Sequence, residues 1–189
     1  KEEVNSTVSK LRKATDTREA LALFREHSRE ELQSDLDFTA EVFGKAVNGF
    51  MNENLRELRK VLTAVEEKKI HLKQVKRVGT LGVTQLDHDI AVEKGLYYYQ
   101  GNDFASEIIF SIRRLAEPMK DHIDNNFSPL SPVQKDDFGK VSEQIISFLR
   151  NCAIMIRKND YIGFEELIAE SITLSLIHIS EPTRHAQIS

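Results

Sequence analysis

The sequence is poor in the residues that build covalent or metal-stapled scaffolds. Among 189 residues there is one cysteine, Cys152, so neither a disulfide framework nor a cysteine-rich zinc site can form. Eight glycines and four prolines exclude collagen-like and low-complexity classes. The longest run without a charged residue, Ser171 to Ser180, has about ten residues, whereas a membrane-spanning helix needs about 20. The net charge of −4 argues against a general nucleic-acid binder, so no nucleic-acid partner is expected.

What is present suits a single domain with its own core, because 40% of the residues are apolar and 30% are charged. The chain begins with Lys1 rather than Met, and no signal-peptide pattern follows. Near the other end, the string LSLIHISEPTR resembles the in-frame translation of a transposase-type sequencing-library adapter. We therefore take residues 1–173 as the native domain, set residues 174–189 aside as a non-native tail, and expect a piece of a longer protein.

Apolar residues recur at helical spacing along the whole chain, whereas the alternating pattern of strands is almost absent. Ser28, with Glu31 three residues later, forms a capping-box pattern that predicts the start of a long helix. The apolar face of that helix comprises Leu32, Leu36, Phe43, Val47 and Phe50. A turn is predicted over 51–54, because Gly49 and the polar residues after it weaken the helix.

The next predicted helix carries an apolar seam close to a heptad repeat, formed by Leu55, Leu58, Leu62, Val65 and Leu72. Gly79 and Gly82 interrupt this pattern, and either a kink or a break fits. Asn102 is predicted to cap a further helix. The inward face of that helix would comprise Phe104, Ile108, Ile112, Leu115 and Met119.

The second half of the chain has clearer boundaries. A loop is predicted over 125–132, where Ser131, Pro132 and Gln134 supply a cap, a first-turn proline and a capping-box partner. The helix after this loop would bury Phe138, Val141, Ile145, Leu149, Cys152 and Ile156. Asp160 is predicted to cap the last helix. Long amphipathic helices joined by short polar turns predict an all-α fold, an antiparallel helix bundle.

Carboxylates four residues apart are the first candidates for chemistry, because neighbouring helical turns bring them close enough to share a metal ion. Glu31 with Asp35 and Glu117 with Asp121 have the form E-x-x-x-D. Similar pairs are Asp37 with Glu41, Asp89 with Glu93 and Asp103 with Glu107. Charged helix faces turned to solvent explain most such pairs, and a divalent metal is the one cofactor that we consider.

Other candidate residues have simple structural explanations. His122 lies beside Asp124 at a predicted helix end, where side chains satisfy the last carbonyls, although phosphorelay domains also use a helical histidine. Cys152 falls on an apolar face, as a small core residue does. The basic run of Lys68, Lys69, Lys73, Lys76 and Arg77 is typical of a solvated face, with anionic lipid or phosphate as the alternative. Because no phosphate-binding glycine loop, serine elbow or paired-cysteine motif is present, we do not expect an enzyme.

The order of motifs carries more information than any one of them. They are SKLRKATD near the start, HSREELQSDLDFTAEVF, LKQVKRVGTLGVTQLDHDIAVEKGLYYYQGND, and lastly IRRLAEPMKDHIDNNFSPL. On these segments, residues 4–172 resemble the cytoplasmic PhoU-like domain at the C-terminus of some bacterial PiT-type inorganic phosphate transporters. The last segment is the most specific part of this resemblance.

The resemblance implies a regulatory or accessory domain rather than a catalyst. PhoU-like domains are three-helix units, often in tandem, with E/D-x-x-x-D motifs that can bind metal clusters. By position, Glu31 and Asp35 match one motif and Glu117 and Asp121 its counterpart, so these four are the implied metal ligands. The implied location is the cytoplasmic side of the inner membrane, and the implied partner is the transmembrane part of the same transporter. An anionic membrane surface facing the basic run and a second copy of the chain are further candidate partners.

Two other functions stay open at this point. A free-standing PhoU-like phosphate-signalling regulator would bind a transporter or a sensor kinase, and its gene would have a start codon shortly upstream. A bundle enzyme or phosphorelay protein would accept a phosphoryl group on His122.

Overall fold

Helices account for nearly all of the structure. The computed structural model of this chain describes residue 9, residues 17–84 and residues 88–180. Within these ranges the elements are α2 (Thr17–Met51), α3 (Leu55–Val83), α4 (His88–Asp124), α5 (Pro132–Lys158) and α6 (Tyr161–Ser180), and no strand occurs. The prediction of an all-α helix bundle is therefore confirmed. None of these described helices is both long enough and apolar enough to cross a membrane.

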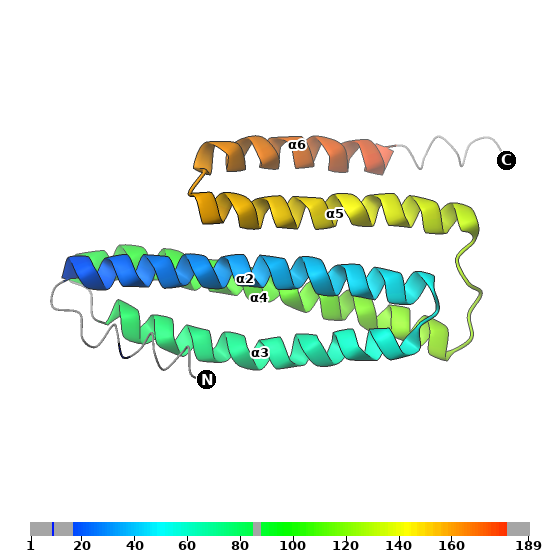
Figure 1. The fold of residues 1–189 in the computed structure, drawn as a ribbon, viewed down its shortest axis with the longest axis horizontal. Helices are drawn as coiled ribbons and strands as arrows, with labels where there is room; N and C mark the ends of the chain where they lie inside the picture. Colours follow the sequence, from blue (N-terminus) through cyan, green and yellow to red (C-terminus); the bar gives the residue numbers. More distant parts are fainter. Residues whose placement is uncertain (1–8, 10–16, 85–87, 181–189) are drawn as a thin grey trace.

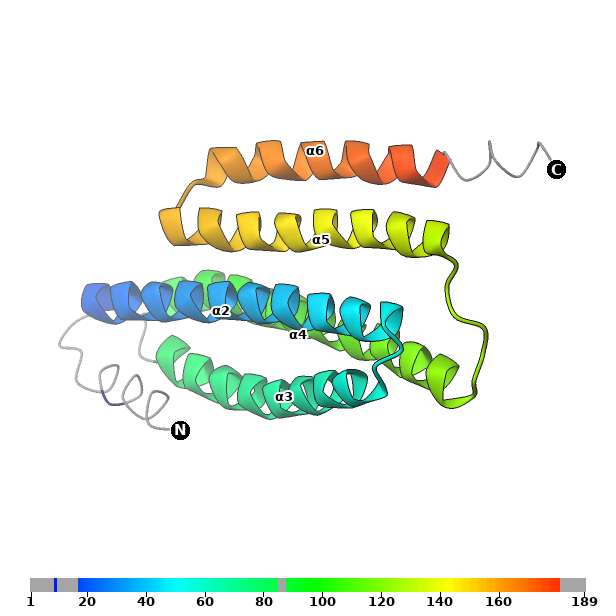
Figure 2. The ribbon, with the colours of Figure 1, turned by 45° about the vertical axis from the view of Figure 1, so that its right-hand side comes forward.

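The helices form a three-helix unit with a helix pair beside it (Figures 1 and 2). Each helix runs antiparallel to the one before it, as the colours in Figure 1 trace. α2, α3 and α4 all contact one another, whereas α5 packs on α2 and α6 packs on α5. α2 is thus shared, since one of its faces belongs to the three-helix unit and another supports α5.

The main core lies inside the three-helix unit. Its buried residues are Val42, Phe43, Ala46, Val47, Leu58, Val61, Val65, Leu72, Ile109, Ile112, Ala116 and Met119. A smaller cluster near the start of α2 joins the same three helices, with the rings of Phe24 and Tyr98 4.9 Å apart. A third cluster attaches α5 to α2 through Leu36, Ala40, Leu149, Cys152 and Ala153. The first two clusters hold the three-helix unit together, and the third attaches the helix pair to it.

The predicted turns at 51–54 and 125–132 are confirmed, and capping side chains explain where the helices begin. Asn54 Oδ1 accepts a hydrogen bond from Glu57 N at 3.1 Å at the start of α3. Ser131 and Gln134 form the predicted reciprocal capping box before α5, with Pro132 in the first turn. These contacts satisfy amide groups that have no partner within a helix.

The two glycines near the end of α3 accompany a break rather than a kink. α3 ends at Val83, and the next helix begins at His88. Gly79 lies within α3 where the ring of Tyr98 from α4 approaches, and a Cβ atom there would come within 2.0 Å of ring atoms. The glycine therefore permits close contact between α3 and α4.

Two predicted helix starts are wrong, because Ser28 and Asn102 lie inside continuous helices. The Ser28 hydroxyl donates to the carbonyl of Phe24 at 2.7 Å, and the Asn102 amide donates to the carbonyl of Tyr98 at 2.8 Å. Both side chains bond back to the preceding turn, which is the alternative that a capping residue has inside a helix. The capping box predicted from Ser28 is therefore absent.

Parts of the predicted inward faces are also wrong. Phe104 is 69% exposed and Ile108 is 39% exposed, while Ile145 on α5 is 41% exposed. In their place α4 buries Ala105 and Ile109, one position further along the helix. The small residues Ala105 and Ala116 on this buried face let the helices approach closely, whereas the Phe104 side chain is left outside.

The boundary between the native domain and the tail at residue 173 stays a prediction. α6 continues as a helix through Ser180. Residues 181–189 lie outside the described residues.

Candidate functional site

The strongest concentration of buried charge lies between α2 and α3. Asp35 on α2 is 3% exposed, and its Oδ1 lies 2.6 Å from Nζ of Lys68 on α3. One turn earlier on α2, Glu31 Oε2 lies 3.2 Å from Nε2 of His71. We call Glu31, Asp35, Lys68 and His71 the α2–α3 charge cluster. Its two carboxylates are the first pair that the sequence predicted, and its two basic side chains are neighbours one turn apart on α3.

Burial decides the electrostatics of Asp35. Removal from water raises the pKa of this carboxyl group above its ordinary value. The ammonium of Lys68 opposes this effect and lowers the pKa. The neighbouring Glu31 raises the pKa further, and His71 lowers it. Lys68 Nζ lies 2.6 Å from the buried Oδ1, so the two charges form a close ion pair. Asp35 is thus a charge that the fold tolerates because Lys68 is beside it.

Lys68 reaches this place because it occupies a seam position of α3. The buried residues Val65 and Leu72 lie three before and four after it, the spacing of a heptad repeat. Its side chain is 10% exposed, and Nζ lies 5.6 Å from the centre of the Phe38 ring. The prediction that the whole basic run is a solvated face is therefore wrong for Lys68. In the seam predicted from the sequence, the repeat position between Val65 and Leu72 falls on Lys69, so that seam gave no signal for Lys68.

A small cavity adjoins the cluster on the side of α4. It has a volume of about 100 Å³ and is lined by Ser28, Glu31, Leu32, Asp35, Tyr98, Gly101, Asn102 and Ala105. The Tyr98 hydroxyl does not bond to the carboxylates but donates to the carbonyl of Val75 at 3.0 Å. Burial raises the pKa of Tyr98 strongly, so its phenol stays protonated. The cavity has room for a few water molecules, and it is smaller than pockets for metabolites.

His27 extends the polar stripe on α2, and the sequence did not single it out as a site residue. It lies one turn before Glu31, is 7% exposed, and its Nε2 has no hydrogen-bond partner among the described residues. The spacing of His27, Glu31 and Asp35 at successive i,i+4 steps could have revealed a buried polar row.

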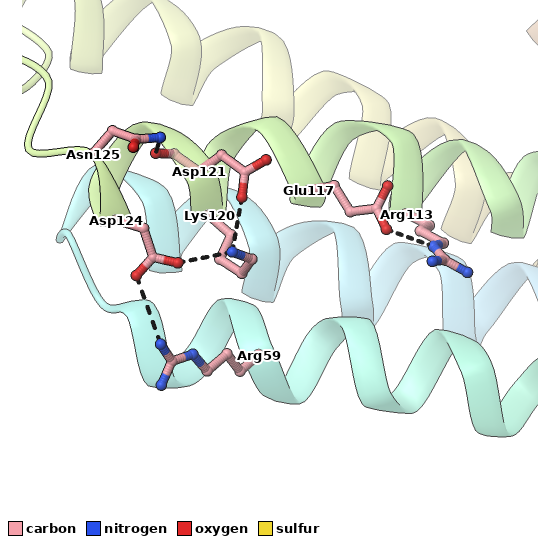
Figure 3. A network of polar contacts seen from close by, with 7 residues as sticks. All are labelled: Arg59, Arg113, Glu117, Lys120, Asp121, Asp124 and Asn125. Carbon is pink, nitrogen blue, oxygen red and sulfur yellow. Dashed lines mark hydrogen bonds and ion pairs between the residues drawn. The ribbon is translucent and has the colours of Figure 1, made fainter.

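The second predicted pair, Glu117 and Asp121, lies on the surface near the end of α4 (Figure 3). Glu117 Oε1 accepts from Arg113 Nε at 2.8 Å, and Asp121 Oδ1 lies 2.8 Å from Lys120 Nζ. Lys120 Nζ also contacts Asp124 Oδ2 at 2.8 Å. In this arrangement Glu117 pairs with Arg113, and Asp121 shares Lys120 with Asp124, as on an ordinary charged helix surface.

The two acidic pairs are not brought together. Among the residues that the structure describes, no three histidine, cysteine or acidic side chains converge in a way that could hold a metal ion. At Asp35, the Lys68 ammonium lies where a cation would bind, so a divalent metal would have to displace it. Metal binding by Glu31, Asp35, Glu117 and Asp121 therefore stays a prediction, and no step of the function proposed below depends on it.

The remaining candidates have local structural roles. His122 Nε2 lies 3.0 Å from the carbonyl oxygen of Ser128, and its ring contacts those of Phe50 and Phe127. These contacts tie the end of α4 to the loop that follows. Cys152 is buried against α2, and burial raises the pKa of its thiol, which disfavours the nucleophilic thiolate.

Comparisons with protein-family models, with curated proteins and with solved structures found no match to this chain. The family resemblance therefore stays a prediction. The functional argument rests on the residues and contacts described above.

Proposed function

We propose that this chain is a PhoU-like, non-catalytic accessory domain that acts on the cytoplasmic side of the membrane in a bacterial inorganic phosphate transporter. Its role would be to regulate or stabilise transport through contacts with the transmembrane part of the same protein. The substrate pathway itself would belong to that transmembrane part.

The observation that carries this proposal is the three-helix unit of α2, α3 and α4. The segments on which the resemblance rests fall largely on these three consecutive long helices. The resemblance implies units of three helices, and α2 to α4 pack in that way. The pair of α5 and α6 lies beside this unit (Figure 1).

The basic run on α3 supports contact with an anionic membrane surface through part of its length. Lys68 forms an ion pair with Asp35 in the interior, and Lys69 Nζ lies 5.4 Å from the centre of the Phe110 ring. Lys73 and Arg77 are exposed, whereas Lys76 is paired with Asp103 at 3.1 Å. Lys73 and Arg77 are thus the residues that we propose for contact with lipid head groups.

The transporter assignment is tested by sequencing the uninterrupted gene across both ends of this chain. Apolar runs of about 20 residues upstream in the same reading frame are expected. A nearby start codon without such runs would contradict the assignment and favour a free-standing PhoU-like regulator. The gene sequence would also test the adapter assignment, because an adapter-derived LSLIHISEPTR should be absent from the uninterrupted gene.

The membrane contact is tested by vesicle co-sedimentation with the purified chain. Replacing Lys73 and Arg77 together by Gln should weaken binding to anionic vesicles, by about 1 kcal/mol for each cation removed. The matched control is Lys60→Gln, on the same helix but outside the basic run, with a side chain that is 63% exposed. Equal binding by the double variant and this control would refute the contact.

A further inference from the structure

α4 carries two apolar seams, and the bundle buries one of them. The buried seam comprises Ala105, Ile109, Ile112, Ala116 and Met119. A second row, which we call the outer seam, comprises Gly101, Phe104, Ile108, Ser111 and Leu115. Its spacing alternates between three and four residues, which is the heptad repeat by which one helix packs along another. Phe104 is 69% exposed and Ile108 is 39% exposed, so the middle of the outer seam is uncovered, whereas Leu115 packs partly against the main core and Gly101 lines the cavity described above.

One row of charges borders the outer seam. Glu107 and Arg114 lie seven residues apart, each with a side chain that is 63% exposed, and they contact each other along the helix. On the other border of the seam, Ala105 and Ile112 are buried within the bundle. The outer seam therefore has opposite charges at successive repeats on its one open side.

We propose that the outer seam is the surface through which α4 pairs, antiparallel and with two-fold symmetry, with α4 of a second copy of this chain. Phe104 would pack against Leu115 of the second copy, and Ile108 against Ser111 of the second copy. The same register brings Glu107 beside Arg114 of the second copy, and the two-fold axis repeats that contact. The surface is thus complementary to itself in the apolar contact of Phe104 with Leu115 and in charge.

The arrangement of charges selects the antiparallel orientation. In a parallel pair, the row holding Glu107 would face the row holding Ala105 and Ile112, which is buried within each copy. In an antiparallel pair the two charged rows face each other, and opposite charges meet. This proposal concerns the surface of the domain and does not depend on the proposed transporter role.

The exposed apolar residues of α6 lack this complementarity. Ile162 is 76% exposed and Ile168 is 38% exposed, but the exposed charges among them are Glu165 and Glu166. Two copies meeting through that face would bring like charges together. The outer seam of α4 is therefore the better surface for self-association.

The expected dimer is weak, because a single pair of short helical segments buries less than a standard interface of about 1,200–2,000 Å². Sedimentation equilibrium of the purified chain should show a mass near 21.6 kDa at low concentration that rises toward twice that value. Phe104→Gln should weaken association on the order of 100-fold, since each dimer loses two buried phenyl rings. The matched control Ile162→Gln removes an equally exposed apolar residue on α6 and should leave association unchanged.

Charge reversal tests the orientation. Glu107→Arg and Arg114→Glu should each prevent self-association, because each places like charges opposite each other. An equimolar mixture of these two variants should associate again, since every facing pair is then opposite in charge. Circular dichroism should find the same helix content in all variants, because the substituted side chains lie on the surface.

Three results would overturn the proposal. One is a wild-type chain that stays monomeric at every concentration, even if the outer seam binds a different protein or a membrane. Another is association that survives Phe104→Gln or is lost in Ile162→Gln. The third is a mixture of the two charge variants that stays monomeric while the wild-type chain forms dimers.

Discussion

Removing the Lys68 ammonium should destabilise the fold more than the loss of any surface charge. The replacement Lys68→Met keeps most of the apolar stem, so it mainly leaves Asp35 without its counter-charge. The two side chains are 10% and 4% exposed, which places the ion pair in the interior. Breaking a buried pair on one side costs about 3–5 kcal/mol, because the remaining charge has no compensation.

Protonation of Asp35 sets an upper limit on this loss. An ordinary aspartate has a pKa of about 3.9, and each pH unit above it adds about 1.4 kcal/mol to the cost of taking up a proton. The limit is therefore about 4 kcal/mol at pH 7 and about 1.5 kcal/mol at pH 5. Within it, we expect Lys68→Met to lower the free energy of unfolding by about 3 kcal/mol at pH 7.

The pH dependence has a definite sign. Without Lys68, the folded-state pKa of Asp35 rises further above its unfolded value, so the folded state binds the proton more tightly. Stability of the variant relative to wild type should then improve as the pH falls toward 5, and worsen as the pH rises through the folded-state pKa. A surface ion pair would not behave in this way.

Urea unfolding at pH 7 and pH 5, followed by circular dichroism, measures both effects. The matched control is Lys60→Met on the same helix, where the lysine that pairs with Glu57 is 63% exposed and the expected loss is under about 0.5 kcal/mol. A loss below about 1 kcal/mol for Lys68→Met at pH 7, or one that does not change with pH, would refute the reasoning. An unchanged slope with urea would establish that the comparison is between like unfolded states.

Two further substitutions test the packing and the capping by the same urea assay. Gly79→Ala should destabilise the fold by about 1–3 kcal/mol, because the new Cβ overlaps the Tyr98 ring and α3 and α4 must separate; a neutral result would mean that the two helices are not in close contact there. Ser131→Ala should cost about 1 kcal/mol through loss of the capping box before α5, and Ser131→Asp should retain most of the stability; equal losses in both variants would contradict a capping role.

The fold class and the loops could be predicted because their signals are local. Ser131 and Gln134 follow a polar loop, where the capping box has amide groups to satisfy. Ser28 and Asn102 are also residue types that cap helices, but the apolar repeat continues on both sides of each of them. Their side chains therefore bond to the preceding helical turn. A capping residue predicts a helix start when the helical repeat is also interrupted before it.

The inward face of α4 could not be chosen from hydrophobicity alone. Two seams overlap on this helix, and the large side chains of Phe104 and Ile108 lie on the one that the bundle leaves uncovered. The bundle buries Ala105 and Ala116 because small side chains allow α2 and α3 to approach. Which seam is buried depends on the shapes of the neighbouring helices, and the sequence of α4 alone does not contain that information.

The acidic half of the α2–α3 charge cluster could also be predicted from a local signal in the sequence. The spacing of Glu31 and Asp35 places both carboxylates on one face of a helix, and the structure does so. Their basic partners come from a helix 30 to 40 residues further along, so the pairing depends on how α2 and α3 align. The place of Lys68 in the seam that α3 buries, between Val65 and Leu72, is evident only from the structure, because the predicted seam runs through Lys69.

The buried pair also gives the contact between α2 and α3 a unique alignment. Sliding α3 by one heptad relative to α2 would keep apolar residues facing apolar residues along most of the seam. It would, however, bury Lys68 away from Asp35 and leave both charges without compensation, at a cost of several kcal/mol. We therefore infer that replacing both residues by apolar ones, as Asp35→Leu with Lys68→Met, leaves stability nearly unchanged while weakening this preference for one alignment. Broader amide resonances for α2 and α3 in the double variant would support that division between stability and specificity, and spectra as sharp as those of the wild type would contradict it.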